Sequence, residues 1–241
     1  MSAVGAIVVV TLRGLLSRRR AVLMVLLAAL PVVVGLLIRL GGGRADAPEI
    51  LDALVVRTVL PLIALIIGTS AIGSEIEDGT LVYLLVKPVP RWQVALAKLA
   101  VAAGLTAVLV VPPIVITGVL VGGFGSASLA VAFGYAVAAI IGGAAYAAAF
   151  ATLGTITSRA LVVGLAYTLL WEGVLAGLLE GTRFLSVRQA TLGIAAALTG
   201  EDPGVDALPV AVAVMIVTVV IVGSAVLTTT MLRRFQVRSP D

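Results

Sequence analysis

Six long apolar stretches constrain this chain more than any other feature of its sequence. Each is close to 20 residues or longer and carries few charges, and together they cover residues 21–40, 51–72, 94–121, 129–154, 161–179 and 207–232. A helix of about 20 apolar residues is long enough to cross the hydrocarbon core of a bilayer. Because unpaired backbone groups are costly in lipid, such stretches favour helices. We therefore predict an all-α membrane protein with six transmembrane helices.

The composition agrees with a chain that resides in lipid. Of the 241 residues, 61% are hydrophobic and 12% are charged, against about 25% charged residues in soluble domains. The absence of Cys excludes disulfides, thiolate metal sites and Cys nucleophiles. The absence of His excludes HExxH metalloproteases and Ser-His-Asp triads. We predict one transmembrane domain over residues 1–241 with no catalytic residue, no metal site and no cofactor of its own.

Two of the stretches carry a further signal. Pro112-Pro113 interrupts residues 94–121, and because membrane helices tolerate such kinks, we expect one bent helix rather than two. In residues 129–154, small residues recur four positions apart along two lines, which allows close helix packing. We favour packing within one subunit, with a dimer seam as the alternative. The two lines are Gly134, Ala138 and Gly142, and Ala139, Gly143, Ala147 and Ala151.

The basic residues predict that both termini are cytoplasmic. With this orientation eleven Lys and Arg residues lie inside and five outside, as the positive-inside rule favours. The inside set is Arg13, Arg18, Arg19, Arg20, Lys87, Arg91, Lys98, Arg159, Arg233, Arg234 and Arg238, and the outside set is Arg39, Arg44, Arg57, Arg183 and Arg188. These residues are dispersed at span ends, so the net charge of +4 reflects topology rather than nucleic-acid binding.

Residues 1–20 predict an amphipathic helix that lies in the membrane interface. Apolar residues share one arc, namely Val4, Val8, Val9, Leu12, Leu15 and Leu16, and a more polar set lies opposite, namely Thr11, Arg13, Gly14, Ser17 and Arg18. A cleaved secretory signal fits less well, because the apolar stretch after Arg20 is longer than a signal requires and lacks a good cleavage site.

The outer segment 180–206 is only partly polar. Its apolar residues predict a short helix or re-entrant segment, closed by a turn at residues 200–204. These apolar residues are Phe184, Leu185, Leu192, Ile194 and Leu198.

The inner loop 74–92 does not resemble a plain basic loop. It carries three carboxylates, then an apolar run, then Pro88 and Pro90. Ser74 and Glu77 have the spacing of a capping box, which predicts a helix that starts here. Leu81, Leu84 and Leu85 would share one face of a short amphipathic helix. Such a helix suits docking against another protein, and a helix that lies on lipid is the alternative.

This loop resembles the first cytoplasmic loop of type-2 ABC transporter permeases, the six-span membrane subunits of ATP-driven exporters. The resemblance is carried by the pattern Glu75-x-Glu77-x-Gly79-Thr80-Leu81-x-x-Leu84-Leu85-x-x-Pro88-Val89-x-Arg91, followed by Lys98. The six spans, the inside termini, the leading helix and the outer segment resemble that family as well.

The resemblance implies a role for each matched residue. A coupling helix that inserts into a separate ATPase subunit would be formed by Gly79, Thr80, Leu81, Leu84, Leu85 and Pro88. Glu75, Glu77 and Arg91 would transmit movement at the base of the loop. The acidic residues would pair with basic residues of the leading helix, for which the candidates are Arg13, Arg18, Arg19 and Arg20.

The source of energy is also constrained. Neither Lys87 nor Lys98 fits the phosphate-binding pattern GxxxxGK[ST], so ATP and Mg are expected in a partner chain. A gradient-driven carrier or channel is the alternative, and it would use Glu172, which lies in the fifth span. The alternatives for Glu172 are a structural hydrogen-bonding residue within the bundle and a residue that lies nearer the membrane surface than the span boundaries suggest.

We therefore expect a permease subunit of an ABC exporter, coupled to a cytosolic ATPase and paired with a second, identical or different, permease chain. The Ala, Val, Gly and Arg content indicates a GC-rich prokaryote, and hence a multi-pass protein of its plasma membrane. An intramembrane enzyme is disfavoured. The paired aspartates expected of lipid phosphotransferases are missing, because the internal aspartates are scattered over both sides of the membrane.

Overall fold

The computed structural model describes residues 3–15, 18–42, 45–77, 79, 90–175, 184–200 and 207–234, and every regular element in these ranges is helical. The elements are α1 (Ala3–Leu15), α2 (Arg18–Leu40), α3 (Ala47–Ile50), the π-helical η1 (Leu51–Val59), α4 (Leu60–Glu77), α6 (Arg91–Gly122), α7 (Ser126–Ile156), α8 (Ala160–Ala166), the π-helical η2 (Tyr167–Leu175), α10 (Val187–Thr199) and α11 (Val210–Arg234). The all-α prediction is confirmed for the described residues.

Five helices in the described part of the chain are long and apolar enough to cross a membrane. They are Arg20–Leu40, Ala47–Ile76, Arg91–Gly122, Ser126–Ile156 and Val210–Arg233. The fifth predicted span, 161–179, corresponds to a shorter apolar helix, Ala160–Val174. Residues 176–183 lie outside the described ranges. The count of six spans therefore stays a prediction.

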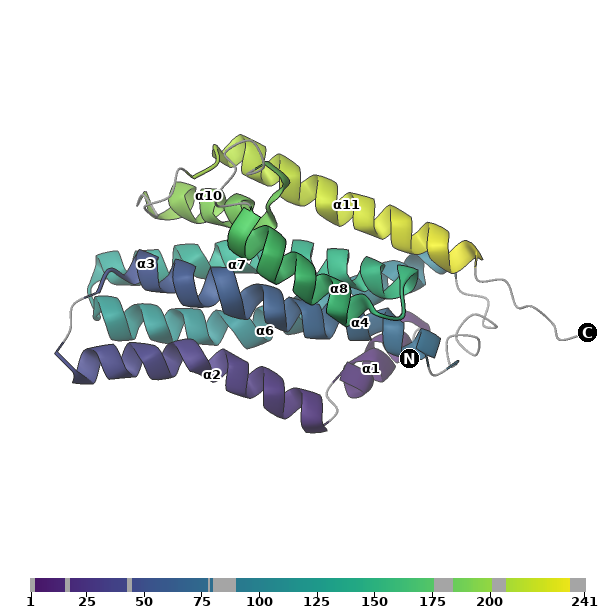
Figure 1. The fold of residues 1–241 in the computed structure, drawn as a ribbon, viewed down its shortest axis with the longest axis horizontal. Helices are drawn as coiled ribbons and strands as arrows, with labels where there is room; N and C mark the ends of the chain where they lie inside the picture. The colour runs from purple at the N-terminus through teal and green to yellow at the C-terminus, as the bar shows by residue number, and fades with distance from the viewer. Residues whose placement is uncertain are drawn as a thin grey trace, which may run out of the picture.

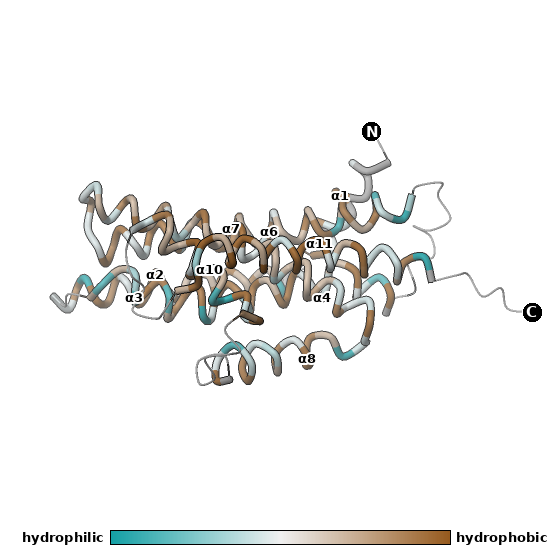
Figure 2. Tube along the Cα trace, turned by 90° about the horizontal axis from the view of Figure 1, so that it is seen from above, coloured by the Kyte–Doolittle hydropathy of each residue, from teal (hydrophilic) through white to brown (hydrophobic). Residues whose placement is uncertain are grey.

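The long helices run along the longest axis of the molecule (Figure 1). Helix α1 lies at one end, where α4 and α11 finish, and α3 and α10 lie at the other. We call these the α1 end and the α10 end. Seen from above, α8 lies at the edge of the bundle (Figure 2), and it packs against α4 and α7. Apolar side chains of α2, α8 and α11 face outward, as expected where helices meet lipid.

Helix α7 is the centre of the bundle because its small residues let four helices approach it. It packs against α4, α6, α10 and α11. Along one line, a Cβ added at Gly134 or Gly142 would meet Thr199 or Thr191 of α10. Along the other, Gly143 faces Leu60 of α4 and Thr106 of α6, and the Ala147 carbonyl faces Gly68 of α4. Both small-residue lines thus pack within one subunit, as predicted.

Two further predictions are confirmed by the helix boundaries. Helix α6 is continuous over Arg91–Gly122 and contains Pro112 and Pro113, so the third stretch is one helix. The outer segment contains α10, which begins after Ser186 and ends at Gly200 in the left-handed conformation (φ 69°). Leu192 and Ile194 are buried in it.

The capping-box prediction is wrong. Helix α4 continues to Glu77, so Ser74 lies in its last turns, and the Ser74 hydroxyl donates to the carbonyl of Ser70 at 2.7 Å. The chain leaves the helix at Gly79, whose φ of 66° is one that glycine adopts without strain. Gly79 therefore forms the turn after α4, and its predicted part in a coupling helix stays a prediction because residues 80–89 lie outside the described ones. The second span runs into the acidic residues as one helix, so no new helix starts at Ser74.

Helix α1 exists as predicted, but its faces differ in part from the expected ones. Leu15, on the predicted apolar face, is buried, and Thr11, on the predicted polar face, is buried too. Helix α1 packs against α6 and α4, which accounts for a buried threonine. Its location in the membrane interface stays a prediction.

We predict that Gly68→Ala destabilises the protein. An added Cβ would lie 2.8 Å from the Ala147 carbonyl oxygen and from Phe150 Cβ, and overpacking typically costs about 1–3 kcal/mol. Thermal unfolding in detergent measures the loss. Gly104→Ala is the matched control, because Gly104 also lies within a membrane helix but has nothing within 4 Å. Equal midpoints for the two variants would contradict close packing at Gly68.

Candidate functional site

A buried ion pair joins the second span to the outer helix α10. Arg188 Nη2 donates to both carboxylate oxygens of Asp52, at 2.9 and 3.2 Å. Asp52 lies in η1 and is 7% exposed, whereas Arg188 lies in the first turn of α10 and is 2% exposed. Since a buried charge is costly unless it is paired, this contact fixes α10 against the start of the second span.

A second carboxylate, Glu172, holds the same end of α10. Its Oε1 accepts hydrogen bonds from Tyr167 Oη (2.9 Å) and the backbone N–H of Val187 (3.0 Å), and its Oε2 accepts one from Ser186 Oγ (2.5 Å). Ser186 also caps α10, accepting from the N–H of Gln189 at 3.1 Å. The first amides of a helix lack partners within it and favour negative charge. Glu172 supplies both an acceptor and that charge.

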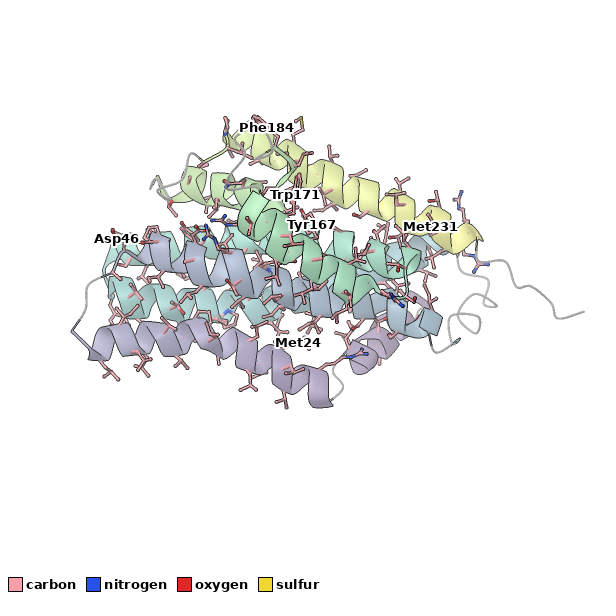
Figure 3. The ribbon with its side chains drawn as sticks, viewed as in Figure 1. Met24, Asp46, Tyr167, Trp171, Phe184 and Met231 are labelled. Atoms are coloured by element: carbon pink, nitrogen blue, oxygen red, sulfur yellow. The ribbon has the colours of Figure 1, made fainter. Side chains whose placement is uncertain are left out.

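These contacts make Glu172 a structural link between η2 and α10. The side chain is 1% exposed and takes three hydrogen bonds, which is the geometry of the structural alternative considered above. Figure 3 shows Tyr167 and Trp171 on the helix that continues α8.

Around Glu172 several buried polar atoms have no hydrogen-bond partner within the described residues. They are Tyr146 Oη, Trp171 Nε1, Arg188 Nε and Gln189 Oε1. The ring of Tyr146, in α7, stacks on Phe150. Unsatisfied buried groups cost free energy. Within the described residues, the polar cluster at the α10 end is thus buried, contains charged side chains and leaves these four atoms without a hydrogen bond.

A third buried contact lies toward the α1 end, at the base of the inner loop. Lys98 Nζ of α6 is 2.5 Å from Glu75 Oε1 of α4, and it also donates to the carbonyl of Ala71 at 3.0 Å. Lys98 is fully buried, and the Glu75 side chain is 16% exposed. The pair clamps together the end of α4 and the third turn of α6, the two helices that the loop connects.

The structure places only some of the predicted site residues. Glu75 forms its described ion pair with Lys98, whereas the side chains of Glu77, Arg13, Arg18 and Arg19 lie outside the described ones. Their predicted pairing stays a prediction. Arg20 is half-buried and lines a cavity beside α4, and Arg91 begins α6. The predicted docking residues Thr80, Leu81, Leu84, Leu85 and Pro88 lie outside the described residues.

Sequence reasoning missed two of these contacts. Asp52 falls within the predicted span 51–72 and Arg188 belongs to the outside set of basic residues, and neither position predicts a partner. One signal could have found the pair. Asp52 and Arg188 have opposite charges and both lie near the predicted outer side, and charges in apolar surroundings need partners. Lys98 was noted only as part of the inside count and the loop pattern, although a lysine 8 residues into the 32-residue α6 needs a partner too.

We predict that Asp52→Asn destabilises the protein more than the double variant Asp52→Asn, Arg188→Gln does. Removing one member of a buried pair leaves the other charge without a partner and costs roughly 3–5 kcal/mol. Replacing both removes that penalty. Thermal unfolding in detergent of the two single variants and the double variant gives the coupling energy. Additive losses would contradict a buried pair.

The structure thus combines long apolar helices with buried polar contacts between them. The loop 74–92 between the second and third predicted spans carries the sequence pattern described above. The model of the family described as ABC-2 family transporter protein matches residues 16–179, which is more than half of the 241 residues. No match was found among curated proteins. The family match confirms the resemblance to type-2 ABC transporter permeases, and the chain belongs to the ABC-2 transporter family.

Proposed function

We propose that this chain is the permease subunit of an ATP-driven exporter and that it works with a separate cytosolic ATPase subunit. Membership of the ABC-2 family supports a membrane component of an ABC transporter. Because neither lysine of the chain fits a phosphate-binding loop, ATP and Mg would be bound by the partner. The α1 end, which carries most of the basic residues, would face the cytoplasm.

The observation that carries this proposal is the ion pair between Glu75 and Lys98. The sequence of the loop between α4 and α6 resembles that of a coupling element, and a coupling element needs a stiff connection to the spans. The Lys98 side chain bonds both Glu75 and the Ala71 carbonyl, so it ties α6 to two turns of α4. Movement imposed on the loop would therefore displace both helices as one unit.

The opposite end supplies an element that such movement can act on. Helix α10 is held by Asp52 from the second span and by Glu172 from η2. Displacement of α4, which continues from η1, would pull on α10 through Asp52 and Arg188. The buried polar atoms near Glu172 that have no hydrogen bond among the described residues could form new hydrogen bonds in a second arrangement of the cluster.

We further propose that two permease chains, identical or different, assemble with two ATPase subunits. The windows of α2 and α11 that would cross the membrane are only 22% and 17% buried. Their apolar outward faces are available to lipid and to a second permease chain alike. A gradient-driven carrier that uses Glu172 has less support, because three hydrogen bonds already fix that carboxylate.

We predict that a cytosolic ATPase co-purifies with this chain from detergent-solubilised native membranes. With a tag on the C-terminus, the eluate should hydrolyse ATP and contain a second chain. The double variant Leu84→Asp, Leu85→Asp should lose both, because charges on the apolar face of the docking helix would have to be buried at the interface.

Phe184→Asp, Leu185→Asp is the matched control for this experiment. It places the same charges on an exposed apolar pair, 55% and 67% exposed, at the α10 end, and should retain the ATPase. Absence of any ATPase with the unaltered chain would refute the ATP-driven assignment. Retention of the ATPase by the Leu84, Leu85 variant would refute docking through this loop.

A further inference from the structure

A small polar cavity lies near the α1 end, between three helices and a turn. Its volume is about 110 Å³, and its lining comes from α2, α4, the turn after α7 and the start of α8. The residues are Arg20, Thr69, Ser70, Gly73, Ser74, Thr157, Ser158, Ala160 and Leu161. One arginine and five hydroxyl groups therefore face a cavity at the end of the apolar spans, and none of the lining residues is acidic.

The hydroxyl groups differ in what they offer to a ligand. Thr69 and Ser74 donate their hydrogens to the carbonyls of Leu65 and Ser70, four residues earlier in α4. Thr157 Oγ1 accepts from the backbone N–H of Arg159 at 3.2 Å, so its hydrogen is left to donate. Ser70 and Ser158 keep their donors as well, since no hydrogen bond uses them within the described part of the chain.

Arg20 provides the charge of this cavity. It is half-buried, and the described residues give it neither an ion pair nor a hydrogen bond. Glu75, which follows the lining residue Ser74, is bonded to Lys98. Arg20 thus adds up to five guanidinium donors to those of Ser70, Thr157 and Ser158. A donor-rich, cationic site without a carboxylate fits an oxygen-rich anion, and a guanidinium matches the oxygens of a phosphoryl group.

The surroundings of the cavity favour a phosphoryl group that belongs to a lipid. Arg20 is the first residue of the apolar α2 span, which is the depth of a head group. Val22 and Leu23 follow it and are 53% and 59% exposed. Across the cavity, Leu161 and Val162 of α8 are 50% and 64% exposed. Apolar side chains on both sides would contact acyl chains while the phosphoryl group enters the cavity.

We propose that this cavity binds a phosphoryl anion, with Arg20 as its charged ligand and Ser70, Thr157 and Ser158 as hydroxyl donors. The phosphoryl group of an anionic phospholipid and free inorganic phosphate share this chemistry, and the apolar flanks favour the lipid. The site does not depend on the ATPase partner, so its test is separate from that of the proposed function.

The test is to measure binding of phosphatidylglycerol to the purified full chain by native mass spectrometry from detergent. The unaltered chain should retain a bound lipid. Arg20→Gln should weaken binding roughly 10-fold or more, since it removes a charge-assisted hydrogen bond, and Ser70→Ala, Ser158→Ala should weaken it less. Arg159→Gln is the matched control, because it removes the same charge from an exposed arginine two residues from Thr157 that does not line the cavity.

Inorganic phosphate in a second arm distinguishes the two sources. If phosphate fails to displace the lipid, the ligand is a head group. If inorganic phosphate binds and the Arg20→Gln variant loses this binding, the cavity is a phosphoryl site whose ligand is soluble. Equal binding by the Arg20→Gln variant and the unaltered chain, or an equal loss in Arg159→Gln, would overturn the proposal, because surface charge alone would then account for it. Both arginine variants should unfold at the same midpoint as the unaltered chain, which excludes misfolding as the cause of weaker binding.

Discussion

Close approach of helix backbones along α7 is the interaction on which the arrangement of this bundle depends. In lipid there is no hydrophobic gain from bringing two apolar helices together, so van der Waals packing and hydrogen bonds must hold them. The small residues of α7 allow that packing with α4 on one side and α10 on another. Thr152 adds hydrogen bonds to α11, with its Oγ1 3.2 Å from the Ser224 carbonyl and 2.9 Å from Thr228 Oγ1.

Buried ion pairs further fix the positions of neighbouring helices relative to one another. The described buried ion pairs are Asp52 with Arg188 and Glu75 with Lys98, and both involve the continuous helix made of α3, η1 and α4. One pair ties the α10 end of this helix to α10, and the other ties its α1 end to α6. A single long helix therefore connects the loop proposed to meet the ATPase with the polar cluster around Glu172. This is the physical route that we propose for transmitting nucleotide-driven movement.

Much of the fold follows from local sequence patterns. The lengths of the apolar stretches give five of the spans, the four-residue spacing of Gly134, Ala138 and Gly142 gives a packing face, and the turn at Gly200 gives the end of α10. The candidate site is less predictable. Asp52 and Arg188 are 136 residues apart, and the sequence around each residue does not indicate which residue is its partner.

Local patterns also misled in places. Ser74 and Glu77 match a capping box, but both lie within α4, where the pattern does not start a new helix. Thr11 is polar by type, yet tertiary packing buries it. The partner of Glu75 depended on how α4 and α6 lie together, which periodicity alone does not specify.

The most direct test of the account asks whether movement passes through the Glu75–Lys98 pair. The chain has no Cys, so one introduced at Phe184, which is exposed near the α10 end, can be labelled with a maleimide as the single reactive thiol of this chain, which is then separated from its partners by gel electrophoresis. In the assembled transporter, ATP should change the labelling rate. Glu75→Lys or Lys98→Glu alone should abolish that change, and the charge-swapped double variant should restore it at least in part. An ATP-dependent change that persists in either single variant, with the ATPase still bound, would contradict transmission through this pair.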